Sequence, residues 1–327
     1  MTEVALLEVR NLCIAVASGG ALLPVVEDVS FAVEAGRTLG IVGESGCGKS
    51  LTSLAIMGLL EGSQVRITAG EIWFAGRELT RLPAAERRAI MGDQMAMIFQ
   101  EPMTSLNPVY RIGDQIVEVL RQHRTMSRRA ALARAAELLA LVRIPAPEER
   151  LKSYPHQLSG GMRQRVMIAM AIACDPGLLI ADEPTTALDV TVQAQILDLL
   201  ADLQARTGMA VVLISHDLGV IAETCQTIAV MYRGRVVESA SAAGLFAEAR
   251  HPYTRGLMAS IPDADADCET LPAIAGRVPR IDEQIGGCAF HPRCPYAASR
   301  CTLETPVTAT YPEDHFVLCH FPDEAAP

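Results

Sequence analysis

Hydrophobic and polar positions near the N-terminus alternate in the manner of β-strands. Residues 6–9 and 26–33 place every second side chain on an apolar face, with Gly and Pro turns between them, which is typical of β-hairpins. The short apolar run 39–42 leads into a glycine-rich loop, and residues 49–60 then read as a helix. A further strand is predicted over 95–99, so the first hundred residues are expected to be rich in strands.

Farther along the chain, a period of three to four residues replaces the alternation. It predicts a helical insert over 113–142 and further helices over 160–174 and 190–205. Two short apolar runs, at 178–181 and 211–214, are typical of buried strands. Strands that alternate with helices indicate an α/β fold, with a largely parallel sheet covered on both faces.

The composition and the periodicity of the sequence change near residue 250. Prolines are frequent from Pro262 to Pro322, acidic side chains gather at 263–267, and the regular periods end. These changes predict two domains, one over 1–250 and a smaller, irregular one over 251–327.

Composition narrows the class of protein. Of the 327 residues, 50% are hydrophobic and 20% are charged, which supports a packed core and excludes a disordered chain. A net charge of -10 disfavours nucleic acid as a partner. The N-terminus has no signal-peptide pattern, and no apolar run approaches the roughly 18–20 residues that span a bilayer. We therefore expect a cytosolic protein that reaches a membrane only through partners.

The strongest chemical signal is a phosphate-binding loop, GESGCGKS at 43–50, placed between the predicted strand and helix. Glycines allow backbone N–H groups to turn toward phosphate oxygens, and the helix N-terminus adds partial positive charge. Lys49 is predicted to reach the β- and γ-phosphates, and the Ser50 hydroxyl to bind Mg²⁺. The predicted nucleotide ligands in this segment are Gly43, Glu44, Ser45, Gly46, Cys47, Gly48, Lys49, Ser50 and Leu51.

A second signal lies directly after the apolar run 178–181, where Asp182 and Glu183 follow. A buried strand that ends in two carboxylates suits the Walker B role of a nucleotide hydrolase. Asp182 is predicted to hold Mg²⁺, and Glu183 to act as general base on the attacking water. Without the upstream loop, the same two residues would indicate only a strand end that meets solvent.

The stretch LSGGMRQ at 158–164 distinguishes between classes of P-loop enzyme. Ser159 offers a hydroxyl, and Gly160 and Gly161 leave N–H groups accessible at a helix start, where an anion binds well. Taken alone, this pattern also fits an ordinary Ser-capped helix. The stretch resembles the signature motif of ATP-binding-cassette (ABC) ATPases, where it contacts ATP held by another subunit.

The resemblance to ABC ATPases implies roles for several more residues. Gln100 matches the Q-loop glutamine, Asp189 the D-loop that crosses the dimer interface, and His216 the switch histidine that contacts the γ-phosphate. The implied catalytic residues are Glu183, His216 and Gln100; the magnesium ligands are Ser50, Gln100 and Asp182; and the added nucleotide contacts are Ser159, Gly160, Gly161, Gln164 and Asp189. The implied fold is a RecA-like P-loop core with an antiparallel β subdomain and a helical subdomain at about 101–174.

Segments outside the ATPase motifs resemble one branch of that family, the ATPases of dipeptide and oligopeptide importers. They are QEPMTSLNP at 100–108, YPHQLSGGMRQ at 154–164, HPYTRGL at 251–257 and GCAFHPRCPYA at 287–297. The branch implies ATP and Mg²⁺ as cofactors, a second and paralogous ABC ATPase, two membrane permeases, and an extracytoplasmic solute-binding protein reached through the permeases. It also implies a peripheral place on the cytoplasmic face of the cell inner membrane. Nickel and glutathione importers share much of this pattern and stay open as alternatives, as does a non-transport ABC ATPase.

Nine cysteines, an odd number, disfavour a disulfide framework in a cytosolic protein. Four of them, Cys288, Cys294, Cys301 and Cys319, lie near the C-terminus with five, six and seventeen residues between them. Four thiolates can bind zinc or an iron–sulfur cluster, but neither the close pair typical of zinc nor a ferredoxin spacing is present.

Chemistry alone therefore leaves three readings of this group open: zinc, an iron–sulfur cluster, or unligated cysteines. His291, His315 and His320 are possible alternative ligands. The family resemblance favours a [4Fe–4S] cluster on the four cysteines, which would stabilise an extension with little periodic core.

Overall fold

The computed structural model describes residues 5–101, 105–186, 188–261 and 274–322. These residues cluster into two compact units, and each is considered by itself. Of the described residues, the first unit holds 5–6, 33–37 and those between 81 and 212, and the second holds 7–32, 38–80 and those from 213 to 322. The described part of 251–327, which was predicted as a separate domain, therefore groups with the phosphate-binding loop.

The first unit is built on short parallel strands and a set of helices. Strand β6 (Met95–Ile98) pairs in parallel with β7 (Leu178–Asp182), and all five residues of β7 are buried. The unit also holds the beginning of β8 (Ala210–Ser215), which is buried along its whole length. Other elements cover these strands on both faces of the sheet. This burial explains why their sequences are continuous apolar runs.

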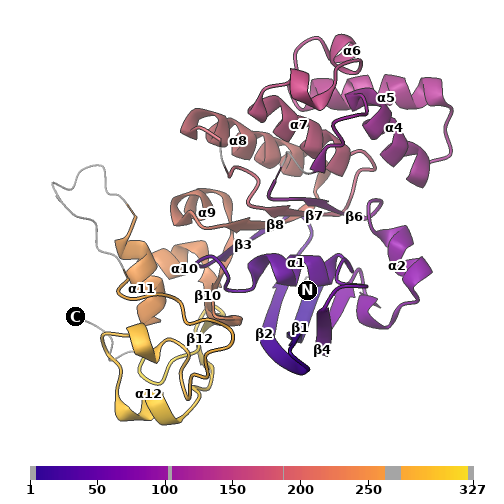
Figure 1. Cartoon of the computed structure of the whole chain (residues 1–327). Coiled ribbons are helices and arrows are strands. Elements are labelled where there is room, and N and C mark those ends of the chain that lie inside the picture. The colour runs from indigo at the N-terminus through magenta and orange to yellow at the C-terminus, as the bar shows by residue number, and fades with distance from the viewer. Residues whose placement is uncertain (1–4, 102–104, 187, 262–273, 323–327) are drawn as a thin grey trace. The chain divides into compact units, whose positions relative to one another are not determined.

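Helices α4, α5 and α7 of the first unit pack on one another, and Figure 1 shows them as one group. They confirm the predicted helical insert, and α8 confirms the predicted helix over 190–205. The helices of this unit are α2 (Ala84–Ile90), α4 (Ile112–His123), α5 (Arg128–Leu141), α6 (Pro147–Arg150), α7 (Gly160–Ala171) and α8 (Val190–Thr207), with a 3-10 turn η2 (Pro155–Gln157). Ser127 caps α5 by accepting from the N–H of Ala130, and Gly208 ends α8 with φ 71°.

The second unit contains an antiparallel sheet in the order β2-β1-β4-β5. Its strands are β1 (Leu7–Ser18), β2 (Ala21–Val33), β4 (Val65–Phe74) and β5 (Arg77–Glu78). Gly19 and Gly20 make the β1–β2 turn with φ 57° and 83°, so the predicted N-terminal hairpin is confirmed. A bulge at Cys13 interrupts the register of β1 with β4.

The other sheet of this unit joins the phosphate-loop strand to the C-terminal segment. β3 (Thr38–Val42) lies parallel to β9 (Thr227–Tyr232), which forms a hairpin with β10 (Arg235–Ser241). The C-terminal segment adds β12 (His315–Val317) to β10 (Figure 1). A further strand, β11 (Ala309–Tyr311), pairs with β12. Strands of three residues are too short to show an alternation, which is why the sequence did not predict them.

Short helices complete the second unit. They are α1 (Lys49–Ile56), the 3-10 turn η1 (Leu79–Arg81) that ends at the edge of the unit, α9 (Leu218–Thr224), α10 (Ala242–Ala247), α11 (Pro252–Ala259), the 3-10 turn η3 (His291–Arg293) and α12 (Ser299–Leu303). Across the described parts of the chain, no helix is both long enough and apolar enough to span a bilayer.

Candidate active site

The phosphate loop begins where the fully buried strand β3 ends, and it closes at the first residue of α1. Gly43 has φ 155°, and a Cβ there would lie 2.2 Å from the carbonyl oxygen of Met231. Gly48 caps α1 with φ 103°, and its added Cβ would lie 3.0 Å from Val26. These two positions require glycine, because the loop backbone turns tightly against its neighbours.

Lys49 places its ammonium group inside the curve of this loop. Its side chain is buried, and Nζ donates to the carbonyl oxygens of Gly43 at 2.6 Å and Glu44 at 3.2 Å. Ser50 follows in the first turn of α1 and is half-buried. A cation beside a helix N-terminus and a glycine-rich turn forms an anion-binding site, so the second unit brings the predicted phosphate ligands together.

Glu44, also predicted as a nucleotide ligand, makes two contacts that sequence reasoning missed. Its carboxylate pairs with Arg293, and its backbone N–H donates to the Tyr253 hydroxyl at 2.9 Å. Both partners lie in segments that resemble the importer branch. Tyr253 is 209 residues and Arg293 is 249 residues from Glu44 in sequence. A single sequence holds no signal that links them to the loop.

In the first unit, β7 delivers Asp182 and Glu183 as predicted. Asp182 is 4% exposed at the strand end, and Glu183 is half-buried with φ 47°. A non-glycine residue in this left-handed region costs about 1 kcal/mol or more, and such outliers concentrate at functional positions. The conformation supports a specific role for Glu183 beyond that of a strand end.

Hydrogen bonds fix the direction of the Glu183 carboxylate. Its Oε2 accepts from Gln100 Nε2 at 2.9 Å and from the Thr186 hydroxyl at 2.8 Å. Gln100 lies 83 residues earlier, just after β6, so the parallel pairing of β6 with β7 brings the two residues together. The predicted general base and the predicted Q-loop glutamine are thus adjacent, while Thr186 is an addition that only the structure supplies.

The signature stretch forms the start of α7. Ser159 is its exposed N-cap and accepts from the N–H of Met162 at 3.3 Å. A Cβ on Gly161 would lie 2.8 Å from Val192 Cγ1, so this glycine allows α7 to approach α8. Gln164 is only 1% exposed. The predicted contacts of Ser159, Gly160, Gly161 and Gln164 with a nucleotide held by another molecule stay predictions.

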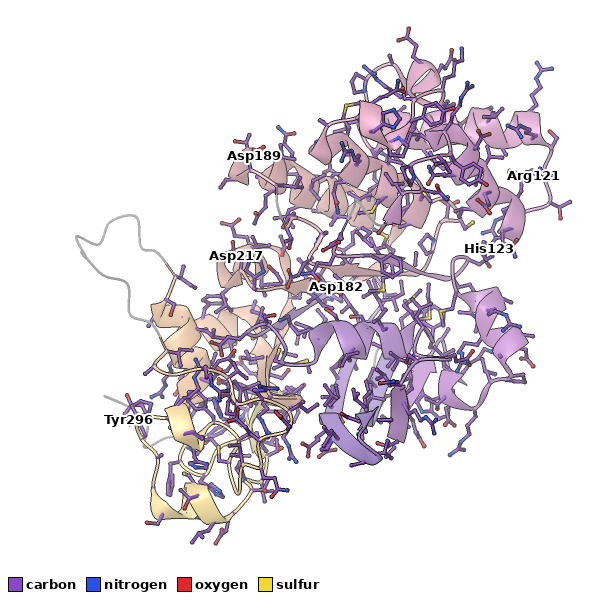
Figure 2. All side chains as sticks on the ribbon, viewed as in Figure 1. Arg121, His123, Asp182, Asp189, Asp217 and Tyr296 are labelled. Atoms are coloured by element: carbon purple, nitrogen blue, oxygen red, sulfur yellow. The ribbon has the colours of Figure 1, made fainter. Side chains whose placement is uncertain are left out.

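Asp189, the predicted D-loop aspartate, and His216, the predicted switch histidine, are both exposed. Asp189 caps α8 by accepting from the N–H of Val192 at 2.9 Å, and Figure 2 labels it at the helix start. Ala187, the first residue of the predicted D-loop motif, is outside the described residues. His216 directly follows β8, and the next residue, Asp217, caps α9 (Figure 2). The predicted magnesium ligand Ser50 belongs to the second unit, and Gln100 and Asp182 belong to the first.

All four C-terminal cysteines line one small cavity of the second unit, with Tyr296 among the other lining residues (labelled in Figure 2). Burial, together with the three neighbouring thiols, raises the pKa of Cys319 to about 11. Burial likewise raises the pKa of Cys288 and Cys294. At neutral pH these thiols are therefore protonated in the absence of a bound cation.

The histidines named as alternative ligands differ in their surroundings. His291 and His320 line the cysteine cavity, whereas His315 is held by the Glu238 carboxylate at 2.8 Å, in a buried pair. Among the described residues, no three His, Cys, Asp or Glu side chains are already arranged to hold a metal ion. The four cysteines thus share a cavity, and the [4Fe–4S] cluster stays a prediction.

Comparisons with known proteins agree with this geometry. The model of the family described as "ABC transporter" matches residues 26–186, and "Oligopeptide/dipeptide transporter, C-terminal region" matches 237–301. The probable peptide ABC transporter ATP-binding protein y4tR of Sinorhizobium fredii is 54% identical, over 89% of this chain and 87% of that protein. The dipeptide transport ATP-binding protein DppD of Escherichia coli is 49% identical over 97% of both chains.

A solved structure has the same core. The dimeric, post-hydrolysis ATP-binding cassette MJ0796, bound to ADP and Pi, superposes with a TM-score of 0.64 at 29% identity. The match covers 72% of this chain and 98% of that cassette. It confirms the predicted ABC nucleotide-binding fold but gives no support to an iron–sulfur extension.

The loop with its buried lysine, the strand-end carboxylates and the capped signature helix define an ATPase of the cassette class. The chain belongs to the ABC transporter family, among the ATP-binding proteins of its dipeptide and oligopeptide branch. It is the ATP-hydrolysing subunit of a transporter.

Proposed function

We propose that this subunit uses ATP hydrolysis to drive the uptake of dipeptides or oligopeptides across the cytoplasmic membrane. The observation that carries the proposal is similarity along nearly the whole chain, 97% of it in the case of DppD, to a protein named for dipeptide transport. The match of 237–301 to the C-terminal region of oligopeptide and dipeptide transporters lies outside the ATPase core and supports the same substrate class.

In the proposed reaction, the loop N–H groups and Lys49 bind the β- and γ-phosphates of ATP. Ser50, Asp182 and Gln100 are the predicted residues that would hold Mg²⁺, and the bound ion would neutralise charge on the phosphates. Glu183 accepts a proton from water as the water attacks the γ-phosphorus in line, and His216 contacts the γ-phosphate. The bond from the γ-phosphorus to the bridging oxygen breaks, so that ADP leaves and phosphate is formed. The two hydrogen bonds that hold the Glu183 carboxylate support this role, because they orient the base before the water arrives.

The signature helix and the D-loop are proposed to act on ATP held by a second cassette. Exposure of Ser159, Gly160 and Asp189 supports this arrangement, because groups at a subunit interface must be open to a partner. The second cassette is proposed to be a paralogue. The other proposed partners are two membrane permeases and, through them, an extracytoplasmic solute-binding protein, which would place this chain peripherally on the cytoplasmic face of the inner membrane.

Isolation of the native complex tests this function. The chain, tagged and extracted from its own membranes in mild detergent, is expected to bring down two integral membrane proteins and a second ATPase. After reconstitution into vesicles with the binding protein, we expect ATP-dependent uptake of a labelled dipeptide. Uptake of nickel or glutathione instead would assign the chain a different substrate class of the same family. Recovery of ribosomes or DNA without membrane proteins would overturn a transport role.

We also propose that the four cysteines hold a [4Fe–4S] cluster. The donor set fits such a group, since all four thiols line one cavity and the N–H of Phe321 donates to Cys319 Sγ at 3.5 Å. When bound, the cluster would supply four iron–thiolate bonds that cross-link the extension. The cysteines must lose their protons to bind it, so loading is expected to weaken as the pH falls.

Anaerobic purification tests the cluster. The full chain is expected to absorb broadly at roughly 400 nm and to contain about four irons. Cys294→Ser is expected to remove the colour, whereas Cys13→Ser, a control outside the cavity, is expected to keep it. Colourless protein with one equivalent of zinc would contradict the assignment.

A further inference from the structure

The phosphate loop contains a carboxylate, that of Glu44, whose negative charge would repel the phosphates of ATP, the proposed ligand. Glu44 follows Gly43 directly and is one residue of the loop that would receive a multiply charged phosphate chain. Like charges at close range repel, and a partly buried site screens this repulsion less than bulk water does. A carboxylate at this position therefore requires a compensating cation.

The C-terminal extension supplies that cation. Arg293, the last residue of η3, contacts both carboxylate oxygens of Glu44, through Nη1 at 2.5 Å and through Nη2 at 3.0 Å. The Arg293 side chain is 3% exposed and that of Glu44 is 31% exposed. A paired, bidentate contact between a guanidinium and a carboxylate is both strong and specific in direction.

Other contacts hold Arg293 in this orientation. Its Nε donates to the carbonyl oxygen of Ala275 at 3.0 Å, and Nη2 also lies 3.4 Å from that of Ile274. The guanidinium stands 5.8 Å from the centre of the Tyr232 ring. These contacts all come from the second unit, so groups of that unit alone orient the guanidinium.

The extension also holds the loop backbone. The Tyr253 hydroxyl of α11 accepts from the N–H of Glu44, and Tyr253 is fully buried. Its ring packs against Tyr232 and Phe290, with centroids 4.7 Å and 5.4 Å away. Phe290 immediately precedes η3, so one aromatic cluster supports both groups that touch Glu44.

We propose that Arg293 is a positioning residue of the ATPase site, which neutralises Glu44 and thereby sets how tightly the phosphate loop binds ATP. The inference rests on the proposed role of this loop in nucleotide binding. It gives the C-terminal extension a part in the ATPase reaction, in addition to any contribution to stability. The same turn places Cys294 in the cysteine cavity, so the loop and the cavity share one short element.

Nucleotide binding by the full chain tests the proposal. Arg293→Met keeps the bulk of the side chain but removes its charge, and it is expected to weaken binding of a fluorescent ATP analogue with Mg²⁺ by about tenfold. The weakening is expected to shrink as salt is added. Arg300→Met is the matched control, because Arg300 is an exposed arginine of the extension that pairs with Glu304. It is expected to bind within about twofold of the parent.

A second substitution distinguishes two roles of Arg293: neutralisation of the Glu44 charge, and structural support of the phosphate loop. Glu44→Gln removes the charge that Arg293 compensates, so the double variant with Arg293→Met is expected to recover most of the lost affinity. Unchanged binding in Arg293→Met, or a loss that Glu44→Gln does not repair, would overturn the proposal. If circular dichroism shows that Arg293→Met is unfolded, Arg293→Lys takes its place, with an expected loss of about threefold that Glu44→Gln again repairs.

Lys49→Ala, measured in parallel, distinguishes this inference from the function on which it rests. Retained binding in that variant would mean that the loop is not the nucleotide site, and the proposed function would fail. Lost binding in Lys49→Ala together with normal binding in Arg293→Met would refute only the role of Arg293.

Discussion

Replacement of Glu183 by Gln is expected to leave ATP binding nearly unchanged and to slow hydrolysis by about 10²–10⁴-fold. The amide keeps the shape of the side chain and can still interact with Gln100 and Thr186, which hold the carboxylate through 2.9 Å and 2.8 Å contacts. It cannot accept the proton of the attacking water. The variant should therefore accumulate with ATP bound between two closed cassettes.

The measurement uses the assembled complex, with the partner cassette also disabled, so that residual turnover reports this site alone. Phosphate release and retained nucleotide are followed in the same sample. Glu137→Gln is the control, because Glu137 is an exposed carboxylate that pairs with Arg134 on α5. It is expected to behave like the parent. Brisk turnover by Glu183→Gln would remove this residue from the role of base.

Replacement of Lys49 by Ala is expected to abolish tight ATP binding. Hydrogen bonds to charged groups contribute about 1.5–3 kcal/mol each, so loss of contacts to two phosphates corresponds to a drop of roughly 10²–10⁴-fold in affinity. The substitution also removes the contacts of Nζ with the carbonyl oxygens of Gly43 and Glu44, which support the curve of the loop.

Equilibrium titration with a fluorescent ATP analogue measures this effect. Lys152→Ala is the matched control, because Lys152 is an exposed lysine in a turn of the first unit. The control is expected to bind ATP as the parent does. Affinity that survives Lys49→Ala would place the nucleotide elsewhere on the chain.

Much of the site was predictable because its chemistry is local in sequence. The phosphate ligands occupy one strand–loop–helix segment, whose glycine spacing is visible in the sequence. The two predicted Walker B carboxylates, Asp182 and Glu183, are the last residue of a buried five-residue strand and the residue after it. Motifs of this kind are recognisable because neighbours along the chain are also neighbours in space.

Other features followed only from packing. Gln164 belongs to a motif that suggests a nucleotide contact, yet its position on α7 buries it. The short helix α2 lies in a region that was predicted to hold strands. The sequence did not predict this helix, because seven residues are too few to show a helical period. The two strands β11 and β12 were missed for a similar reason, since each has three residues.

The sequence by itself determined the ATPase class, the phosphate loop, the strand-end carboxylates and the branch of the family, because each depends on residue types at short, fixed spacings. Tertiary structure alone decided which distant residues meet: Gln100 with Glu183 across parallel strands, and Arg293 with Glu44 across 249 residues of chain. The physical reason is that sheet pairing and side-chain packing choose these partners, and neither leaves a periodic trace in the order of amino acids.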